Sequence, residues 1–294
     1  MKGNMLERMA LAAVAFLVVA LSVLVAGLAF LLGPASQAEA SVIDLTGAIG
    51  AQGTVHSALF RVDDATEAAG TGVIDAYVQL NPGGSVIVER GINTSGRPSN
   101  YNDFDAQNTG THNYNLQLNQ LAIRRVDGVS YVEFLLDINE AQTAVDRYLS
   151  MDAFQIYTSP TASLFSSTFT PAGNELAGTI TSLGTLRYNM DADTDSVVLL
   201  DSELIASGSG RADMTALIPL SAFSGASATD YVYVYSYFGN EGFDSVNNRN
   251  YGSGDGFEEW ARPVNPLEPA PEPATLAFLA LGGVGLLVRR RRGT

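Results

Sequence analysis

The chain has no cysteine, one lysine, one tryptophan and two histidines in 294 residues. Without thiols it has no disulfide bridge and no thiol chemistry, so its stability must come from core packing alone. The histidines, His56 and His112, form no HExxH pair, and the sequence has no GxSxG elbow. We interpret His56 as a structural residue in the middle of a strand. This inventory argues against an enzyme.

The acidic side chains also make a poor catalytic pair. A glycosidase needs two carboxyl groups about 5–9.5 Å apart. Glu133 and Asp137 share a strand face but would lie about 13 Å apart at the rise of a strand. Glu258 and Glu259 would point to opposite faces of a strand. Only a cleft that joins carboxylates from distant parts of the sequence would create such a site.

Basic residues are scarce in the middle of the chain. Residues 41–263 contain 27 acidic residues, 10 arginines and no lysine, a net charge of −17. A surface this acidic argues against nucleic acid or anionic lipid as a partner. It is compatible with divalent cations or neutral glycans.

The C-terminal end combines three elements in a fixed order. Pro271, Glu272 and Pro273 precede an uncharged run over residues 274–288. The run is followed by four basic residues: Arg289, Arg290, Arg291 and Arg292. Proline cannot continue a helix backward, the apolar run partitions into lipid, and the arginines resist crossing it. Fifteen residues give about 22 Å of helix, less than the ~30 Å hydrocarbon core, so a transient segment is favoured over a permanent tail anchor.

This tail resembles the PEP-CTERM signal of Gram-negative bacteria, which an exosortase in the inner membrane recognises and cleaves near the Pro-Glu-Pro. The resemblance covers about a twelfth of the chain. It implies an exosortase-type processing enzyme as a partner. It also implies anchoring in the inner membrane before processing, followed by release or attachment at the cell surface or outside the cell.

The N-terminal end predicts export independently. Lys2 and Arg8 precede an uncharged stretch from Met9 to Leu32, and the small-x-small site at residues 38–40 follows. This is the pattern of a secretory signal peptide over residues 1–40. Its apolar region is longer than usual, so an uncleaved anchor stays open as the alternative. Under the positive-inside rule both basic ends stay cytoplasmic, which places residues 41 to about 270 across the inner membrane.

The exported body shows the alternating pattern of strands separated by turn-rich stretches. The predicted strands are Val55–Val62, Val73–Leu80, Val86–Ile92, Leu116–Val126, Val129–Ile138, Val197–Leu200, Leu217–Ile218 and Tyr231–Phe238. Residues 139–149 have helical spacing. We therefore expect an all-β, antiparallel β-sandwich of jelly-roll type over residues 41–262, between an N-terminal signal helix and a C-terminal transmembrane helix at 274–294. A Pro-rich linker, 263–273, joins the sandwich to that helix.

The body also resembles a recurring domain of exported PEP-CTERM proteins. The segments that carry this resemblance are GTGVIDAYVQL, which ends at Leu80, VEFLLDINE at 132–140, LSMDAFQIY at 149–157 and DGFEEW at 255–260. The resemblance implies an envelope or surface β protein and brings no established activity with it.

Two patterns are candidate binding sites. Tyr231, Tyr233, Tyr235 and Tyr237 alternate, which puts four rings on one strand face about 7 Å apart. Sugars stack on flat aromatic surfaces, so this ladder either binds a polysaccharide or packs against neighbouring strands. The second pattern is an acidic run in a predicted turn: Asp191, Asp193 and Asp195.

Three alternate carboxylates favour a hard cation such as calcium. A full EF-hand loop would have glycine and glutamate where Ser196 and Ser202 stand, so the run is either a looser calcium loop or a solvated acidic turn. Asp255 and Glu258, with Asn247 or Asn250, are a weaker cation candidate. The only tryptophan, Trp260, is expected to fill the core.

The Asn-rich stretch over residues 93–115 is predicted to consist mainly of turns, because Asn and Asp side chains form hydrogen bonds to their own backbone there. It is also long enough for a functional loop. Taken together, the sequence predicts an exported, non-enzymatic protein of the cell envelope or extracellular matrix. The alternative is a glycan-binding β-sandwich, assisted by calcium, and a carbohydrate-active enzyme is the third hypothesis.

Overall fold

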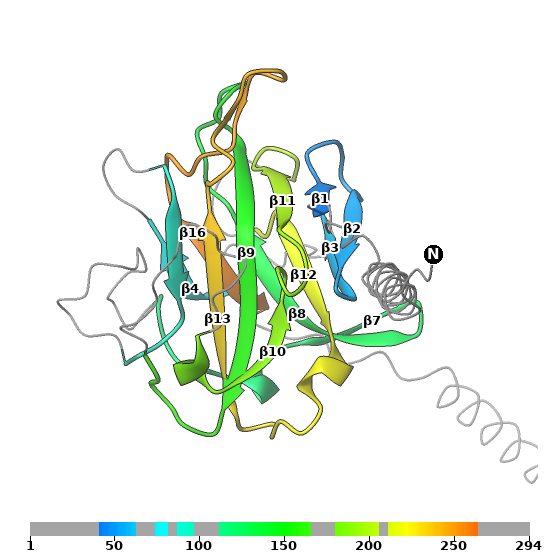
Figure 1. Ribbon diagram of the computed structural model, residues 1–294, viewed down its shortest axis with the longest axis vertical. Coiled ribbons are helices and arrows are strands. Elements are labelled where there is room, and N and C mark those ends of the chain that lie inside the picture. Colours follow the sequence, from blue (N-terminus) through cyan, green and yellow to red (C-terminus); the bar gives the residue numbers. More distant parts are fainter. Residues whose placement is uncertain are drawn as a thin grey trace, which may run out of the picture. The chain divides into compact units, whose positions relative to one another are not determined.

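Strands are the only long regular elements in the part of the chain that the structure describes. This computed structural model describes residues 41–62, 74–81, 87–96, 112–165, 180–205 and 211–263 (Figure 1). Within those ranges the helical elements are short 3₁₀ turns: η1 (Leu118–Gln120), η3 (Thr181–Leu183) and η4 (Leu220–Phe223). None of these helices could cross a membrane. The predicted signal peptide and the predicted transmembrane tail both lie outside the described residues.

The first sheet has seven strands in the order β1-β11-β9-β13-β5, with β10 also paired to β9 and β6 to β13. Their bounds are β1 Ser41–Asp44, β5 Glu89–Ile92, β6 Leu116–Gln117, β9 Tyr148–Ser159, β10 Thr185–Asn189, β11 Ser196–Asp201 and β13 Tyr231–Phe238. All of these pairings are antiparallel except that of β1 with β11.

The second sheet also has seven strands, in the order β2-β3-β12-β8-β16-β4, with β7 paired to β8. Their bounds are β2 Gln52–Val55, β3 Ala58–Arg61, β4 Ile74–Leu80, β7 Ile123–Val126, β8 Val129–Asp137, β12 Met214–Pro219 and β16 Glu258–Pro263. A separate two-stranded hairpin joins β14 (Phe243–Asp244) to β15 (Arg249–Asn250). The predicted all-β class is confirmed.

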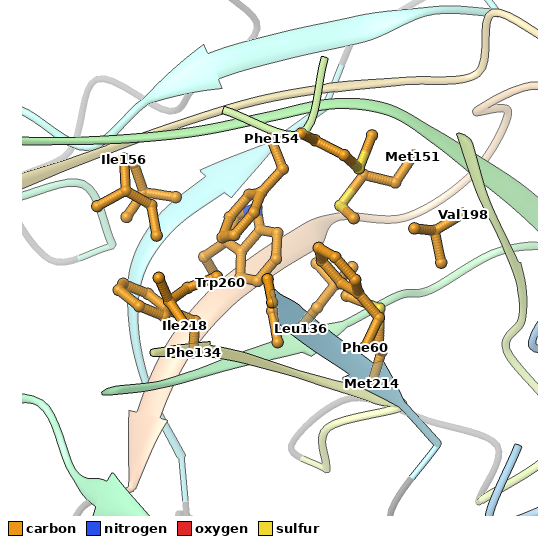
Figure 2. Close-up of a cluster of buried hydrophobic side chains, with 14 of the residues drawn as sticks. Phe60, Phe134, Leu136, Met151, Phe154, Ile156, Val198, Met214, Ile218 and Trp260 are labelled. Carbon is orange, nitrogen blue, oxygen red and sulfur yellow. The ribbon is translucent and has the colours of Figure 1, made fainter. Parts of the chain in front are cut away.

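A single apolar core lies between the two sheets. Figure 2 shows its aromatic centre, where the rings of Trp260 and Phe154 stack with centroids 4.4 Å apart. The Phe154 ring also meets Phe60 and Phe134 edge-on, at 6.2 and 6.1 Å. Trp260 is completely buried, and its Nε1–H donates to Ser236 Oγ at 2.9 Å. The predicted role of Trp260 as a core residue is therefore confirmed.

The predicted strand over residues 55–62 is instead a hairpin. β2 ends at Val55, β3 begins at Ala58, and these two residues pair directly. The two residues between them, His56 and Ser57, both have positive φ, 46° and 68°. Positive φ at both central positions is the requirement of a type I′ turn, whose twist matches that of the flanking strands. His56 is therefore a turn residue, and its mid-strand placement was wrong.

The predicted helix over residues 139–149 is also wrong. The segment is irregular apart from one turn at residues 144–146, and its last residues, Tyr148 and Leu149, already belong to β9. Local side-chain bonds compete with the helix: Thr143 Oγ1 accepts the Asp146 N–H at 2.9 Å and donates to the Asp146 carboxylate at 2.8 Å. Asp146 also accepts from Asn250 Nδ2, which ties the turn to β15.

Candidate functional site

The four tyrosines of β13 share one face of the first sheet, as predicted, but they do not form an exposed platform. Tyr233 and Tyr235 are completely buried, and Tyr231 and Tyr237 are half-buried at either end. Leu183 is part of the apolar cluster that covers the central rings. Buried rings offer no face to a sugar, so the predicted tyrosine platform for glycan stacking is not formed in this structure.

Hydrogen bonds fix this covering layer to the tyrosine face. The Tyr233 hydroxyl donates to Thr161 O at 2.7 Å and accepts from the Leu164 N–H at 3.1 Å. The Tyr157 hydroxyl, on the adjacent strand β9, accepts from the Ile180 N–H at 2.8 Å. Each hydroxyl therefore holds a segment of chain over the sheet, which is the packing alternative that the sequence left open.

The Asn-rich stretch caps backbone where the structure describes it. β13 pairs with β6 at residues 231–232 and with β5 at 235–238, which leaves a gap between them. Asn93 fills this gap: its Nδ2 donates to Val232 O at 2.9 Å, and its Oδ1 accepts from the Val234 N–H at 2.6 Å. Asn113 Oδ1 similarly accepts from the Thr94 N–H. Residues 97–111 lie outside the described part.

The predicted calcium ligands do not converge. Asp191 is buried, and its Oδ1 accepts from the Ser196 N–H at 3.0 Å, so it closes the turn. Asp193 points outward, with its carboxylate 3.8 Å from His56 Nδ1. Asp195 is exposed as well. Within the described ranges, no three acidic or histidine side chains are gathered as ligands of one metal ion.

The weaker cation candidate is not assembled either. Asn247 Nδ2 donates to Asp244 Oδ2 within its own hairpin, at 2.7 Å. Asn250 Nδ2 donates to Asp146 instead. Glu258 is completely buried. The two amides are therefore hydrogen-bonded to other carboxylates, and among the described residues these side chains are not gathered as ligands of a cation.

One glutamate of each local carboxylate pair considered from sequence has a structural partner. Glu133 is buried on β8 and forms an ion pair with Arg124 of the adjacent β7, Nη2 to Oε1 2.7 Å. Glu259 is hydrogen-bonded to Gln79 across the β16–β4 pair. Both glutamates therefore hold neighbouring strands of the second sheet together.

Three glutamates are buried together at one end of the sandwich: Glu89, Glu140 and Glu258. Glu258 begins β16 and pairs with the last residue of β4, whereas Glu89 begins β5 and pairs with the last residue of β13. Glu140 follows the end of β8, and both of its carboxyl oxygens accept from the Gly254 N–H at 3.2–3.3 Å. Sequence reasoning missed this grouping because the three residues lie far apart in the chain.

Burial dominates the electrostatics of this group. It raises the pKa of Glu140 to about 9, and the neighbouring Glu258 charge adds to the rise. The pKa of Glu258 is also raised well above its usual value, first by burial and then by the charge and hydrogen bond of Glu89. Glu140 therefore keeps its proton at neutral pH. A protonated carboxyl donates a hydrogen bond, which a buried carboxylate cannot do.

Another buried acid, Asp152, lies at an irregularity of β9. The pairing of β9 with β13 shifts register between Tyr237 and Phe238, opposite this residue. Its Oδ2 accepts from the Asn240 N–H and the Ser150 hydroxyl, both at 2.9 Å, and so holds the turn that follows β13. Burial raises the pKa of Asp152 to about 7, despite these two hydrogen bonds.

The β14–β15 hairpin carries two well-exposed apolar side chains, one of which is the most exposed large apolar side chain among the described residues. Phe243 is 57 % exposed, and Val246, at the turn, is 88 % exposed. The base of the hairpin is held by Arg249, whose guanidinium lies over the Tyr148 ring, 4.6 Å from its centroid, and donates to Thr46 Oγ1 at 2.8 Å. A rigid base therefore presents an apolar tip to solvent.

The comparison with known proteins bears on the tail. A family model described as the PEP-CTERM protein-sorting motif matches residues 269–292. The chain carries a PEP-CTERM sorting motif. This confirms the resemblance in the tail and indicates an exported protein that is targeted to an exosortase, with a membrane-anchored sorting signal before processing. No curated protein and no solved structure matches the chain.

Proposed function

We propose that the chain is a non-enzymatic protein of the cell envelope or extracellular matrix, whose β-sandwich is delivered by the sorting tail. The sorting motif at residues 269–292 carries the proposal. Two further observations support it. The net charge of −17 over residues 41–263 suits a solvated extracellular surface. Glu133 and Glu259, which belong to the carboxylate pairs considered from sequence, have structural partners in the described strands.

Processing by an exosortase is tested by changing Pro271, Glu272 and Pro273 to alanine in the native cell. The expected result is that wild-type protein reaches the surface or medium with both ends trimmed, while the variant stays full-length at its C-terminus in the inner membrane. The reason is that the enzyme would no longer recognise the segment next to the apolar run. Intact-mass measurement of each cell fraction shows which ends remain.

A matched control changes Pro266 and Glu268 to alanine, in the same linker but outside the matched motif. This control should be processed like the wild type. Wild-type release of the triple variant would contradict exosortase processing. Untrimmed wild-type protein dissolved in the cytoplasm would contradict export altogether.

Binding of an extracellular polysaccharide is the second candidate, and the exposed Phe243 favours a place for it on the hairpin. An aromatic ring beside polar groups is a surface on which sugars stack. The same hairpin carries polar groups, because Asp244 follows Phe243 in the chain and accepts a hydrogen bond from the amide of Asn247. In this second candidate the proposed contact with the polysaccharide is the single exposed ring of Phe243, not the four tyrosines of β13.

Affinity electrophoresis through a gel that contains the native exopolysaccharide tests this second candidate. Wild-type protein should be retarded relative to a gel without polysaccharide, and Phe243→Ala should lose most of the retardation, about tenfold in apparent Kd. Leu220→Ala is the control, because Leu220 is similarly exposed, at 41 %, but belongs to η4. Equal retardation of wild type and Phe243→Ala would exclude the hairpin as the glycan contact.

A further inference from the structure

Strand β1 is attached to both sheets of the sandwich. It begins at Ser41 and pairs in parallel with β11 of the first sheet. Its side chain Ile43 is buried in the core and packs on β2 of the second sheet, because a Cβ at Gly53 would lie 2.6 Å from Ile43 Cγ2. Just after the strand, the Leu45 N–H donates to Leu199 O at 2.9 Å. This edge strand is therefore an integral part of the fold.

The backbone nitrogen of Ser41 lies at the acidic turn that precedes β11. It donates to the carbonyl oxygen of Asp195 at 2.9 Å. The Asp195 side chain is exposed, and Asp193, two residues earlier, is 3.8 Å from Nδ1 of His56 in the β2–β3 turn. Asp191 closes the turn. The Ser41 nitrogen therefore lies beside a turn that carries three carboxyl groups, one of which faces a histidine.

The predicted cleavage point of the signal peptide falls immediately before this strand. The small-x-small site occupies residues 38–40, which lie outside the described part, and Ser41 follows it. Hydrolysis breaks the peptide bond between Ala40 and Ser41 and consumes one water molecule. The oxygen of the water completes a carboxylate on Ala40, and its two protons convert the Ser41 nitrogen into an ammonium group. The N–H that donates to Asp195 O would then belong to a cation.

We propose that Ser41 is the first residue of the mature protein, and that its ammonium group holds the edge strand β1 on the turn before β11 by donating to Asp195 O. The cleavage itself rests on the export proposed above. A hydrogen bond from a charged donor is stronger than one between neutral groups. The carboxyl groups of Asp193 and Asp195 add electrostatic attraction. Cleavage therefore frees β1 from the signal segment and strengthens its bond to the first sheet.

The composition of the chain gives this N-terminus a distinctive chemistry. The only lysine, Lys2, belongs to the predicted signal peptide. Cleavage after residue 40 therefore leaves the α-amino group of Ser41 as the sole primary amine of the mature protein. An uncleaved chain would instead carry amines at residues 1 and 2. Reagents that acylate amines thus distinguish the two forms.

The test is trace acetylation of the protein, purified from its native cell, between about pH 6 and about pH 10, with mass spectrometry to locate the acetyl group. We expect one reactive amine, at Ser41. Its pKa should lie above the usual α-amino range of about 7.7–8.0, because the hydrogen bond and the nearby carboxyl groups favour the charged form. Asp195→Asn should lower this pKa, so that the amine reacts about two- to fivefold faster at neutral pH.

Asp127→Asn is the matched control, because it removes one exposed carboxyl group from the turn between β7 and β8. It should leave the reactivity of Ser41 unchanged. If Asp195→Asn does not fold, the pKa of the wild-type amine decides alone.

Three outcomes would overturn the proposal. Acetylation at residues 1 and 2 would show that the signal segment is retained. A first residue other than Ser41 would place the cleavage elsewhere. A Ser41 amine that titrates in the usual range and does not respond to Asp195→Asn would show that the ammonium group is not held at the turn. The tail is processed at a separate site, so each of these results would leave exosortase processing standing.

Discussion

Replacing Trp260 by alanine is expected to destabilise the sandwich by about 3–5 kcal/mol, the usual cost of removing a buried large aromatic side chain. The side chain is completely buried and stacks on Phe154 at the centre of the core (Figure 2). Its removal leaves a cavity that the surrounding strands cannot close without shifting. It also leaves the Ser236 hydroxyl without the indole N–H. Chemical denaturation of wild type and variant measures the difference in the free energy of unfolding.

Two further variants separate the contribution of the buried, stacked ring from that of the hydrogen bond to Ser236. Trp260→Phe keeps most of the stacking but loses the bond to Ser236, so we expect it to cost less than alanine, about 1–2 kcal/mol. Phe257→Ala removes an aromatic residue three positions away that is 38 % exposed, and it should cost about 1 kcal/mol or less. If Trp260→Ala were no worse than Phe257→Ala, the core would not be organised around Trp260.

Several strands were predictable from the sequence. β8 and β4 were predicted within one residue of their observed bounds, and β13 was predicted from Tyr231 to Phe238, as found. Alternation of two kinds of residue made these strands visible, because successive side chains point to opposite faces of a strand. β9 was missed although it is the longest strand, since all twelve of its residues are buried. The buried residues of β9 include both polar and apolar side chains, so they do not separate into a buried face and a solvent face.

The candidate site was less predictable, because it depends on which segments cover which faces. The sequence placed all four tyrosines of β13 on one side, but only the structure shows that Leu164 and Ile180 belong to the layer over them. For the same reason, the sequence did not predict that Glu89 and Glu258 are buried at the same end of the sandwich. They are separated by more than half of the chain, and only sheet packing brings them together.

Gly239→Ala is expected to destabilise the fold by about 3 kcal/mol or more, because a Cβ at this position meets backbone on two sides. Gly239 has φ of 89°, where alanine alone costs about 1–2 kcal/mol. Its Cβ would also lie 2.2 Å from Ile87 O and 2.8 Å from Ser253 N. These two atoms are hydrogen-bonded to each other at 2.9 Å, so neither can retreat without breaking that bond.

Gly225→Ala is the matched control for the backbone term. Gly225 has a similar φ of 79°, but a Cβ there would meet nothing within 4 Å. The free energy of unfolding of Gly225→Ala should therefore fall by only roughly 1–2 kcal/mol, which is the cost of alanine at positive φ. The difference between the two free energies of unfolding isolates the clash at Gly239. Equal losses of stability in the two variants would mean that Ile87 and Ser253 can move to accept the Cβ. The hydrogen bond between Ser253, before β16, and Ile87, before β5, would then not hold this end of the sandwich.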